Sequence, residues 1–246
     1  MKNIASWKST KYEWRNGKLR ASRDAKKVTV SSQLMTDISA SLYQEYIPRH
    51  ATGKLVDLGC GMVPLYDCYK KYITENTCVD WPNSLHQNQY LDITCSLNEP
   101  LPIQAHSFDT IILSEVLEHI AEPELLWREM ERILKPNGKI LLGVPFLYKI
   151  HEAPHDYFRY TEFALRNFAL KNKLEIAELV PYGGLPAVLT DIYAKQVSKL
   201  PVIGKWFSSI IQSFCWWFMR TGFGKRISNK SAVHYPLGYF MIARKP

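Results

Sequence analysis

The chain has 246 residues, of which 46% are hydrophobic and 22% charged, and this suits one water-soluble α/β domain with additions. Its net charge of +8 comes from the two ends: residues 1–30 hold nine Lys or Arg against two acids, and residues 183–246 hold nine against one. Residues 31–182 hold thirteen against twenty, so the central part is acidic. Because an enzyme that acts on nucleic acid needs a basic cleft in its core, this distribution argues against a nucleic-acid partner.

The five cysteines are an odd number and include no C-x-x-C pair. This argues against a disulfide framework or a zinc site, and it fits a reducing compartment. The first eight residues contain no continuous apolar segment, so no secretory signal is expected. We therefore expect a cytoplasmic protein.

Residues 1–30 are basic and contain three aromatic residues, Trp7, Tyr12 and Trp14. Two interpretations fit this composition: a solvated arm without fixed structure, or a flap that substrate or cofactor orders. A helix is expected next, from the N-cap residues Ser31 and Ser32 to about residue 47, where Pro48 should end it.

The segment 54–64 is a short apolar run that ends at two glycines. Residues 55–58 are predicted to form a buried strand, and Gly59 and Gly61 allow a sharp turn against which a ligand can lie. Asp57, just before the turn, is unfavourable to bury unless something pairs with it. A strand, a glycine turn and a helix present backbone N–H groups to a nucleotide-like ligand, although the pattern by itself also fits a tight turn in any α/β domain.

Three later segments extend this pattern. Residues 77–81 form a second strand that reaches Asp80, about 20 residues on, where a ribose-binding carboxylate is expected. Residues 108–114 form a third strand, followed by Glu-Val-Leu-Glu-His-Ile. Residues 132–142 close a helix, turn at Asn-Gly and open a fourth strand, which continues to Phe146.

The remaining elements alternate between the two types. Further helices are expected over 65–72, 123–134 and 162–171, and further strands over 90–93, 174–180 and 237–244. Such alternation predicts a parallel sheet with helices on both faces. In such sheets the ligand lies beyond the carboxyl ends of the strands, where the acids and glycines named above are found.

This ordered set resembles the class I S-adenosylmethionine-dependent methyltransferases, in the methyltransferase type 11-like branch. The motifs that carry the resemblance are V-D-L-G-C-G at 56–61, F-D-x-I with a later L-E-H-I at 108–120, and L-K-P-x-G-K at 134–139. The resemblance covers about residues 53–182 and the last strand. It implies a Rossmann-like, doubly wound α/β fold, with a mostly parallel seven-stranded sheet, an antiparallel last strand and helices on both faces.

The expected organisation has four parts, with a helical insertion before the last strand. These parts are a basic N-terminal arm over 1–30, the S-adenosylmethionine-binding core over 31–182, the insertion over 183–236 and the final core strand over 237–246.

The resemblance implies that S-adenosylmethionine is the cofactor. The residues expected on its methionine and ribose side are Asp57, Gly59, Cys60 and Gly61. Asp80 should accept hydrogen bonds from both ribose hydroxyls, since an ionised carboxylate offers only acceptors. Trp81 should lie against the adenine.

Two further stretches complete the implied cofactor site. Ser96 and Leu97 match a segment near the adenine amino group; Ser96 stands where the family has an acid, and Asp92 is the alternative. Ser114 and Glu115 should lie beneath the sulfonium and the transferred methyl group. An NAD-dependent dehydrogenase is the competing interpretation, but the G-x-G-x-x-P turn and the later motifs do not belong to that fold.

Residues 151–161, H-E-A-P-H-D-Y-F-R-Y-T, follow the fourth strand and should overhang the methyl donor. Histidine titrates near neutrality, so the candidates for a general base are His151, His155 and Asp156. His119 either reaches the substrate or packs beneath the loop. The H-x-x-x-H-D pattern also fits a metal site or a structural network with Arg159, and we expect no metal site.

The H-D-Y-F-R-Y-T run is similar to methyltransferases of bacterial surface-polysaccharide and other sugar-modifying pathways. The expected reaction is O-methylation of a sugar, a nucleotide-sugar or a lipid-linked glycan. An aromatic or polyketide-like acceptor is the alternative within the enzyme class. A non-catalytic S-adenosylmethionine-binding module is the alternative outside it.

The insertion contains an amphipathic helix over about 205–220, whose aromatic and aliphatic residues share one face. Three interpretations fit it: a helix docked on its own domain as a lid, a homodimer interface, or a contact with the inner membrane surface. The nearby basic residues favour the membrane slightly, since anionic headgroups attract them. These residues are Lys199, Lys225, Arg226 and Lys230.

Overall fold

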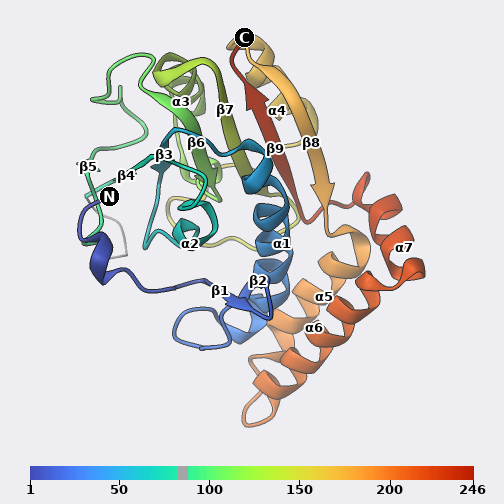
Figure 1. Ribbon diagram of the computed structural model, residues 1–246. Helices are drawn as coiled ribbons and strands as arrows, with labels where there is room; N and C mark the ends of the chain where they lie inside the picture. Colours follow the sequence, from blue (N-terminus) through green and yellow to red (C-terminus); the bar gives the residue numbers. More distant parts are fainter. Residues whose placement is uncertain (83–87) are drawn as a thin grey trace.

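The computed structural model describes residues 1–82 and 88–246, and its centre is a seven-stranded sheet (Figure 1). The strands in spatial order are β5 (Ile93–Thr94), β4 (Glu75–Asp80), β3 (Lys54–Leu58), β6 (Phe108–Ser114), β7 (Leu134–Pro145), β9 (Gly238–Arg244) and β8 (Glu175–Tyr182). Strand β9 is antiparallel to both of its neighbours, and the other neighbouring pairs are parallel. The predicted mostly parallel sheet with an antiparallel last strand is confirmed.

Helices cover both faces of this sheet. Successive residues of β3, Leu55 and Val56, belong to two separate apolar clusters, because side chains of a strand alternate between its faces. The Leu55 cluster includes residues of α1 (Gln33–His50) and α2 (Tyr66–Tyr69), and the Val56 cluster includes residues of α3 (Pro123–Ile133) and α4 (Glu162–Lys171). The carboxyl ends of β3, β4, β6 and β7 therefore meet at one edge between the two helix layers.

The N-terminal segment is folded onto this core. After the short turn η1 (Ile4–Ser6), strands β1 (Tyr12–Arg15) and β2 (Lys18–Ala21) form a hairpin whose residues Tyr12 and Leu19 are each 2% exposed. The turn residues Asn16 and Gly17 have φ of +49° and +70°, as a two-residue hairpin turn requires. The interpretation of the arm as solvated and unstructured is wrong for this hairpin, and its Asn-Gly pair was the signal for it.

Two predicted helix boundaries are wrong. A short turn η2 (Val30–Ser32) precedes α1, where Ser32 makes no side-chain cap, and α1 continues through Pro48 to His50. The proline lies in the last turn and removes only one N–H, while Tyr46 and Ile47 anchor the helix end in the core. The helix predicted over 65–72 is reduced to the single turn of α2.

Two predicted strand boundaries also differ. β7 begins at Leu134, so the predicted Asn-Gly turn lies within the strand. Asn137 has φ of +64°, and the register of the pairing between β6 and β7 shifts in this part of the strand. β5 holds only Ile93–Thr94, paired with the end of β4. The turn η3 (Leu117–His119) follows β6.

The insertion forms three helices, α5 (Gly184–Val197), α6 (Gly204–Arg220) and α7 (Gly222–Ala232), which pack on one another beside α1 (Figure 1). Helix α6 is docked through its small and polar side, since its buried residues are Gly204, Ser208, Gln212 and Cys215. Gln212 accepts a hydrogen bond from the Leu34 N–H at 2.9 Å and donates one to the Val30 carbonyl at 2.7 Å. These bonds fix which side of α6 faces the domain.

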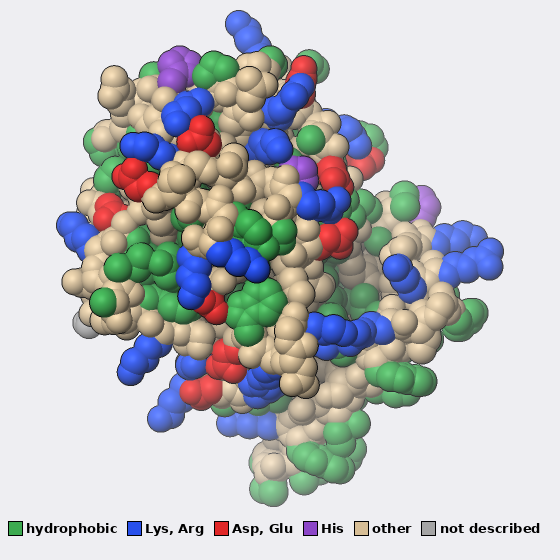
Figure 2. Space-filling view, in the orientation of Figure 1, with side chains coloured by type: hydrophobic (Ala, Val, Ile, Leu, Met, Phe, Trp, Pro, Cys, Tyr) green, Lys and Arg blue, Asp and Glu red, His purple; other side chains and the backbone are tan. Residues whose placement is uncertain are grey.

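The apolar side of α6 consequently faces outward. Its large exposed residues, which we name the α6 outer face, are Trp206, Phe207, Ile210, Phe214 and Trp217. Figure 2 shows apolar side chains gathered where the insertion protrudes at the bottom of the molecule, with Lys and Arg beside them. No helix within residues 1–82 and 88–246 has both the length and the apolar character needed to cross a bilayer.

Candidate active site

The glycine turn after β3 is tied to the acid at the end of β4. Gly59 has φ of +68°, and a Cβ there would lie 2.6 Å from a Val116 methyl group, so only glycine fits. The Gly61 N–H donates to Asp80 Oδ2 at 2.9 Å, and the Trp81 N–H donates to Asp80 Oδ1 at 2.8 Å. Because each carboxylate oxygen has two lone pairs, a carboxylate can accept hydrogen bonds from ribose hydroxyls as well as from backbone N–H groups. The predicted loop, acid and indole are therefore together.

Asp57 lies beneath this turn and is 3% exposed. The Tyr69 hydroxyl donates to its Oδ2 at 3.3 Å. Burial raises the pKa of Asp57 to about 7, and the nearby Asp80 charge acts in the same direction. A cationic ligand group beside Asp57 would lower that pKa and ionise the carboxyl, which suits a cofactor that carries positive charge.

The other residues expected near the cofactor differ in their hydrogen-bond partners and in their burial. The Asp92 carboxylate accepts the Cys78 N–H at 2.8 Å, which commits it to the β4 backbone, whereas Ser96 Oγ accepts only the local Asn98 N–H at 3.2 Å. This contrast favours Ser96 over Asp92. Leu97 is 5% exposed within the Val56 cluster, so its side chain is a core residue. Cys60 is also buried, beside Asp57.

Glu115 follows Ser114 at the end of β6 and has an unusual backbone conformation, with φ of +54°. Its carboxylate accepts from Lys11 Nζ at 2.5 Å and from Ser39 Oγ at 2.9 Å. Burial alone would raise the pKa of Glu115, but Lys11 and Ser39 lower it below its ordinary value. An ionised carboxylate is thereby held at the predicted methyl position by the N-terminal segment.

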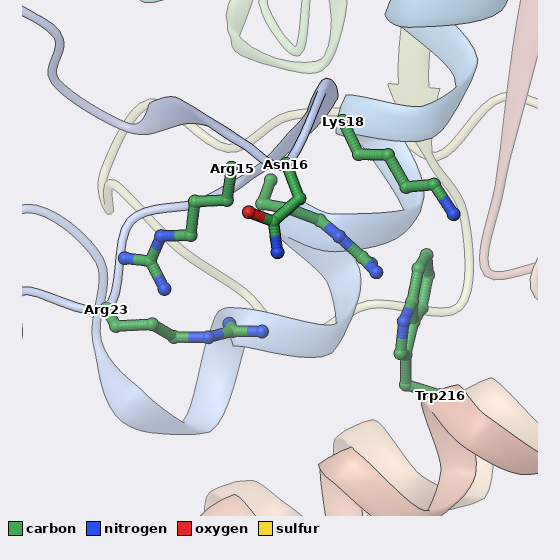
Figure 3. Close-up of a pocket in the computed structure, with 6 residues that line it drawn as sticks. Arg15, Asn16, Lys18, Arg23 and Trp216 are labelled. Atoms are coloured by element: carbon green, nitrogen blue, oxygen red, sulfur yellow. The ribbon is translucent and has the colours of Figure 1, made fainter.

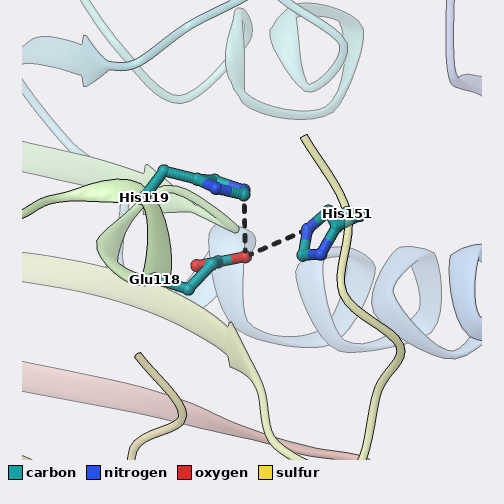
Figure 4. Close-up of side chains that lie close together, drawn as sticks. All are labelled: Glu118, His119 and His151. Atoms are coloured by element: carbon teal, nitrogen blue, oxygen red, sulfur yellow. Dashed lines mark ion pairs between the residues drawn. The ribbon is translucent and has the colours of Figure 1, made fainter. Parts of the chain in front are cut away.

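A buried acid faces two imidazoles just beyond this point, and we name Glu118, His119 and His151 the Glu118 cluster. Glu118 is 0% exposed, and its Oε1 lies 3.7 Å from His119 Nε2 and 3.7 Å from His151 Nε2. Figure 4 shows both rings turned toward this carboxylate. Neither oxygen of Glu118 has a hydrogen-bond partner among the described residues. A buried carboxylate without such a partner is costly, which makes the cluster a candidate functional site.

The ring of His119 is held by a hydrogen bond, and the backbone N–H of His151 is held by Asp156. His119 Nδ1 lies 2.7 Å from the His155 carbonyl oxygen, and His151 Nδ1 lies 3.3 Å from Asp156 Oδ2. Burial alone would lower the pKa of His151, but Glu118 and Asp156 raise it above its ordinary value. Because a carbonyl oxygen can only accept, Nδ1 of His119 carries the proton that it donates to the His155 carbonyl.

The other base candidates are less suited to accept a proton. Burial acts to raise the pKa of Asp156, but the two-pronged ion pair with Arg159 lowers it to about 2. His155 is bonded to the Tyr157 hydroxyl at 3.0 Å, and its ring contacts Trp81 edge-on with centroids 5.1 Å apart. Asp156 thus orients His151, and His155 joins the 151–161 loop to the cofactor side.

The Glu118 cluster could also hold a divalent metal ion, because one ligand atom from each residue lies within 4.8 Å of the others. Two imidazoles and a carboxylate suit zinc or iron. This donor set differs from the H-x-x-x-H-D pattern considered from the sequence. Of the three, Glu118 was missed, although an acid in an otherwise apolar V-L-E-H-I run was a signal for it.

Two partners of Glu115 were also missed. Lys11 lies 104 residues before it and Ser39 lies 76 residues before it, so no local pattern could have paired them.

Part of the chain is similar to known methyltransferases. Residues 56–142 match the family model described as a methyltransferase domain. The ubiquinone biosynthesis O-methyltransferase of Coxiella burnetii is 32% identical over 111 residues, which cover 40% of this chain and 47% of that protein. Phosphoethanolamine N-methyltransferase 2 of Caenorhabditis elegans is 30% identical over 109 residues, covering 44% and 24%. The chain thus spans less than half the length of these curated relatives.

The likeness in structure extends further than the likeness in sequence. A SAM-dependent methyltransferase from Archaeoglobus fulgidus has a TM-score of 0.54 and 15% identity, and the match covers 83% of this chain and 91% of that one. Residues 56–142 therefore form a methyltransferase domain, and the chain has the fold of the class I methyltransferases, with S-adenosylmethionine as its cofactor.

Proposed function

We propose that the chain is an enzyme that methylates a hydroxyl group of a sugar, a nucleotide-sugar or a lipid-linked surface-glycan intermediate. The observation that carries this proposal is the position of the Glu118 cluster. Its loop reaches the cofactor side through the contact of His155 with Trp81, next to the loop that Asp80 holds. The 151–161 loop also exposes the rings of Tyr157 and Phe158, which suit the apolar face of a sugar.

When bound, S-adenosylmethionine supplies the methyl group on a positively charged sulfur. The residues of the chain fix the geometry: Asp80 and the Gly61 loop hold the ribose side, and Glu115 lies ionised beneath the reacting atoms. His151 accepts the acceptor's hydroxyl proton, and the Glu118 carboxylate, which faces its ring, stabilises the resulting imidazolium. Asp156 accepts the backbone N–H of His151 and so fixes the position of this residue in the loop.

The same proposal assigns roles to the parts of the chain. Residues 31–182 together with 237–246 form the catalytic core. Residues 1–30 supply Lys11 to Glu115 and act as a fixed cover over this edge. Residues 183–236 bring the core to a cytoplasmic membrane surface, where a lipid-linked acceptor would be found.

The test is transfer of a labelled methyl group from S-adenosylmethionine to candidate acceptors. We expect label in a glycan or sugar-nucleotide acceptor and none in aromatic or amine acceptors. Label found only in the latter would move the function toward those of the curated relatives. Cofactor binding with no transfer to any acceptor would leave a binding module.

The base is tested by His151→Gln, which should lower turnover by about 10²–10⁴-fold and leave cofactor affinity unchanged. His234→Gln, which alters an exposed histidine on the insertion, is the control. Turnover retained in His151→Gln would contradict the assignment. Loss of wild-type turnover on addition of a chelator, restored by zinc, would show that the cluster acts through a metal ion instead.

A further inference from the structure

An open pocket of about 390 Å³ lies between the β1–β2 hairpin and helix α6. Its lining, which we name the basic pocket, consists of Arg15, Asn16, Lys18, Arg20, Arg23 and Trp216. Figure 3 shows the charged side chains of the hairpin on one side and the Trp216 ring of α6 on the other. The basic pocket is outside the predicted cofactor site.

The positive charge of the basic pocket is only partly balanced. Arg15 pairs with Glu13 at 3.0 Å and Arg23 pairs with Asp37 at 2.6 Å. Within residues 1–82 and 88–246, no carboxylate oxygen lies within 4 Å of the charged nitrogens of Lys18 or Arg20. Two cations that line the pocket without such an ion pair favour an anionic ligand, and phosphate is the anion that guanidinium groups bind best.

Arg20 is held ready for such a ligand. Its guanidinium carbon lies 4.4 Å from the centre of the Trp216 ring, which fixes the side chain across the pocket. Burial lowers the pKa of Arg20 from its ordinary value; the charge of Asp37 acts to raise it, and the charges of Arg220 and Arg23 add to the lowering. A phosphate in the pocket would relieve this repulsion.

The basic pocket borders the α6 outer face, since Trp216 of the pocket is followed directly by Trp217 of that face. The loop before α6 adds further exposed apolar residues, and Val202 is 100% exposed. Three aromatic residues of the face, Trp206, Phe214 and Trp217, are each more than 60% exposed. An aromatic face with cationic borders is the pattern of helices that lie in a membrane interface.

The charges of the insertion favour an anionic membrane over a second copy of the chain as the partner of this face. The only acid in residues 183–236 is Asp191, which is 1% exposed and forms an ion pair with Lys195. The exposed charged residues of the insertion are all cations: Lys199, Lys205, Arg220, Lys225, Arg226 and Lys230. A second copy docked on this face would bring cations against cations, whereas an anionic bilayer complements them.

We propose that this side of the molecule docks on an anionic membrane, with the α6 outer face in the headgroup region and the phosphate of a lipid in the basic pocket. This inference rests on the proposed function in one respect: docking would bring the core to a lipid-linked acceptor. The docking needs neither cofactor nor acceptor, so a failure of methyl transfer leaves its test intact.

The test is sedimentation of the full chain with vesicles of phosphatidylcholine alone and with phosphatidylglycerol added. Wild-type protein should sediment with the anionic vesicles and lose affinity as salt rises. The double variant Lys18→Gln, Arg20→Gln should bind anionic vesicles on the order of 10-fold more weakly, since each cation near the surface contributes about 1 kcal/mol. Phe214→Ser with Trp217→Ser should weaken binding to both vesicle types.

The matched control is Phe163→Ser, which removes a residue that is 73% exposed on α4, away from the insertion. It should bind as wild type does. Failure of folded wild-type protein to sediment with anionic vesicles would overturn the proposal. So would equal binding by the Lys18 and Arg20 double variant, or saturable binding of inorganic pyrophosphate without vesicle binding, which would assign the pocket to a soluble phosphate. A dimer that Trp217→Ser dissociates would assign the face to a second copy.

Discussion

The strand ends and helix α6 both bury polar side chains, but they do so with opposite consequences. At the strand ends, Asp57 and Asp80 are buried at the predicted cofactor site, and their surroundings are apolar strands and helices. On α6, Ser208 and Gln212 are buried against the domain, and the aromatic side chains face outward. Buried polarity therefore accompanies the predicted cofactor site in the first region, whereas in the second it marks the side of α6 that packs on the domain and leaves the apolar side exposed.

The comparison also shows what an amphipathic pattern can and cannot predict. The apolar side of α6 was predicted correctly as a face, because it depends only on a period of 3.6 residues. The side that packs on the domain is decided by the hydrogen bonds of Gln212 to Val30 and Leu34, which lie about 180 residues earlier. No local pattern contains that information.

The largest expected effect concerns the buried acid of the first region. Because Asp57 has a pKa of about 7 in the folded chain and an ordinary value when unfolded, the folded state binds more protons between about pH 4 and 7. Stability should therefore fall as pH rises through this range and level off above it. The total is up to about 4 kcal/mol, since one pKa unit corresponds to about 1.4 kcal/mol.

Urea unfolding without cofactor measures this effect. Asp57→Asn should remove the fall and be more stable than wild type above pH 7, because Tyr69 can still donate to the amide oxygen. Asp109→Asn is a control with the opposite expected sign. Burial tends to raise the pKa of Asp109, but Lys135 and the Lys54 N–H lower it below its ordinary value. This variant should therefore be less stable than wild type at neutral pH. If the free energy of unfolding changes with pH in the same way for wild type and Asp57→Asn, the pKa of Asp57 is not raised in the folded chain.

A smaller effect is expected where α6 docks. Gln212→Ala would leave the Leu34 N–H and the Val30 carbonyl without their partner, and should lower the free energy of unfolding by about 2–3 kcal/mol. Ser213→Ala, next to it on the exposed side, should change stability by less than about 0.5 kcal/mol. Equal stability of the two variants would mean that the polar side of α6 does not hold the helix on the domain.

The sequence predicted the first region well because its evidence is local. Strands β3, β4 and β6 lie within two residues of their expected bounds, since each is a short apolar run that ends in Gly, Asp or Ser. Parallel strands then bring Asp57, Gly61 and Asp80 together without further information. The hairpin turn at Asn16 and Gly17 could also have been predicted, because Asn-Gly between strand-like residues is a strong local signal.

The parts that could not be predicted depend on distant pairs. The ion pair of Lys11 with Glu115 and the arrangement of His119 and His151 around Glu118 join segments that the fold alone brings together. The role of Leu97 is a related case: its motif position suggests the cofactor, whereas its side chain packs in the core.

The most direct test of the strand-end site is calorimetric titration of S-adenosylmethionine into wild type, Asp80→Ala and Asp109→Ala. Asp80→Ala should bind the cofactor more weakly by about 1–3 kcal/mol, because the ribose hydroxyls lose a charged acceptor and the Gly61 N–H loses its partner. Asp109 lies at the opposite end of the same sheet, where it accepts from the Lys54 N–H, and its loss should leave the affinity unchanged. Unchanged affinity in a folded Asp80→Ala protein would show that the cofactor does not bind at these strand ends.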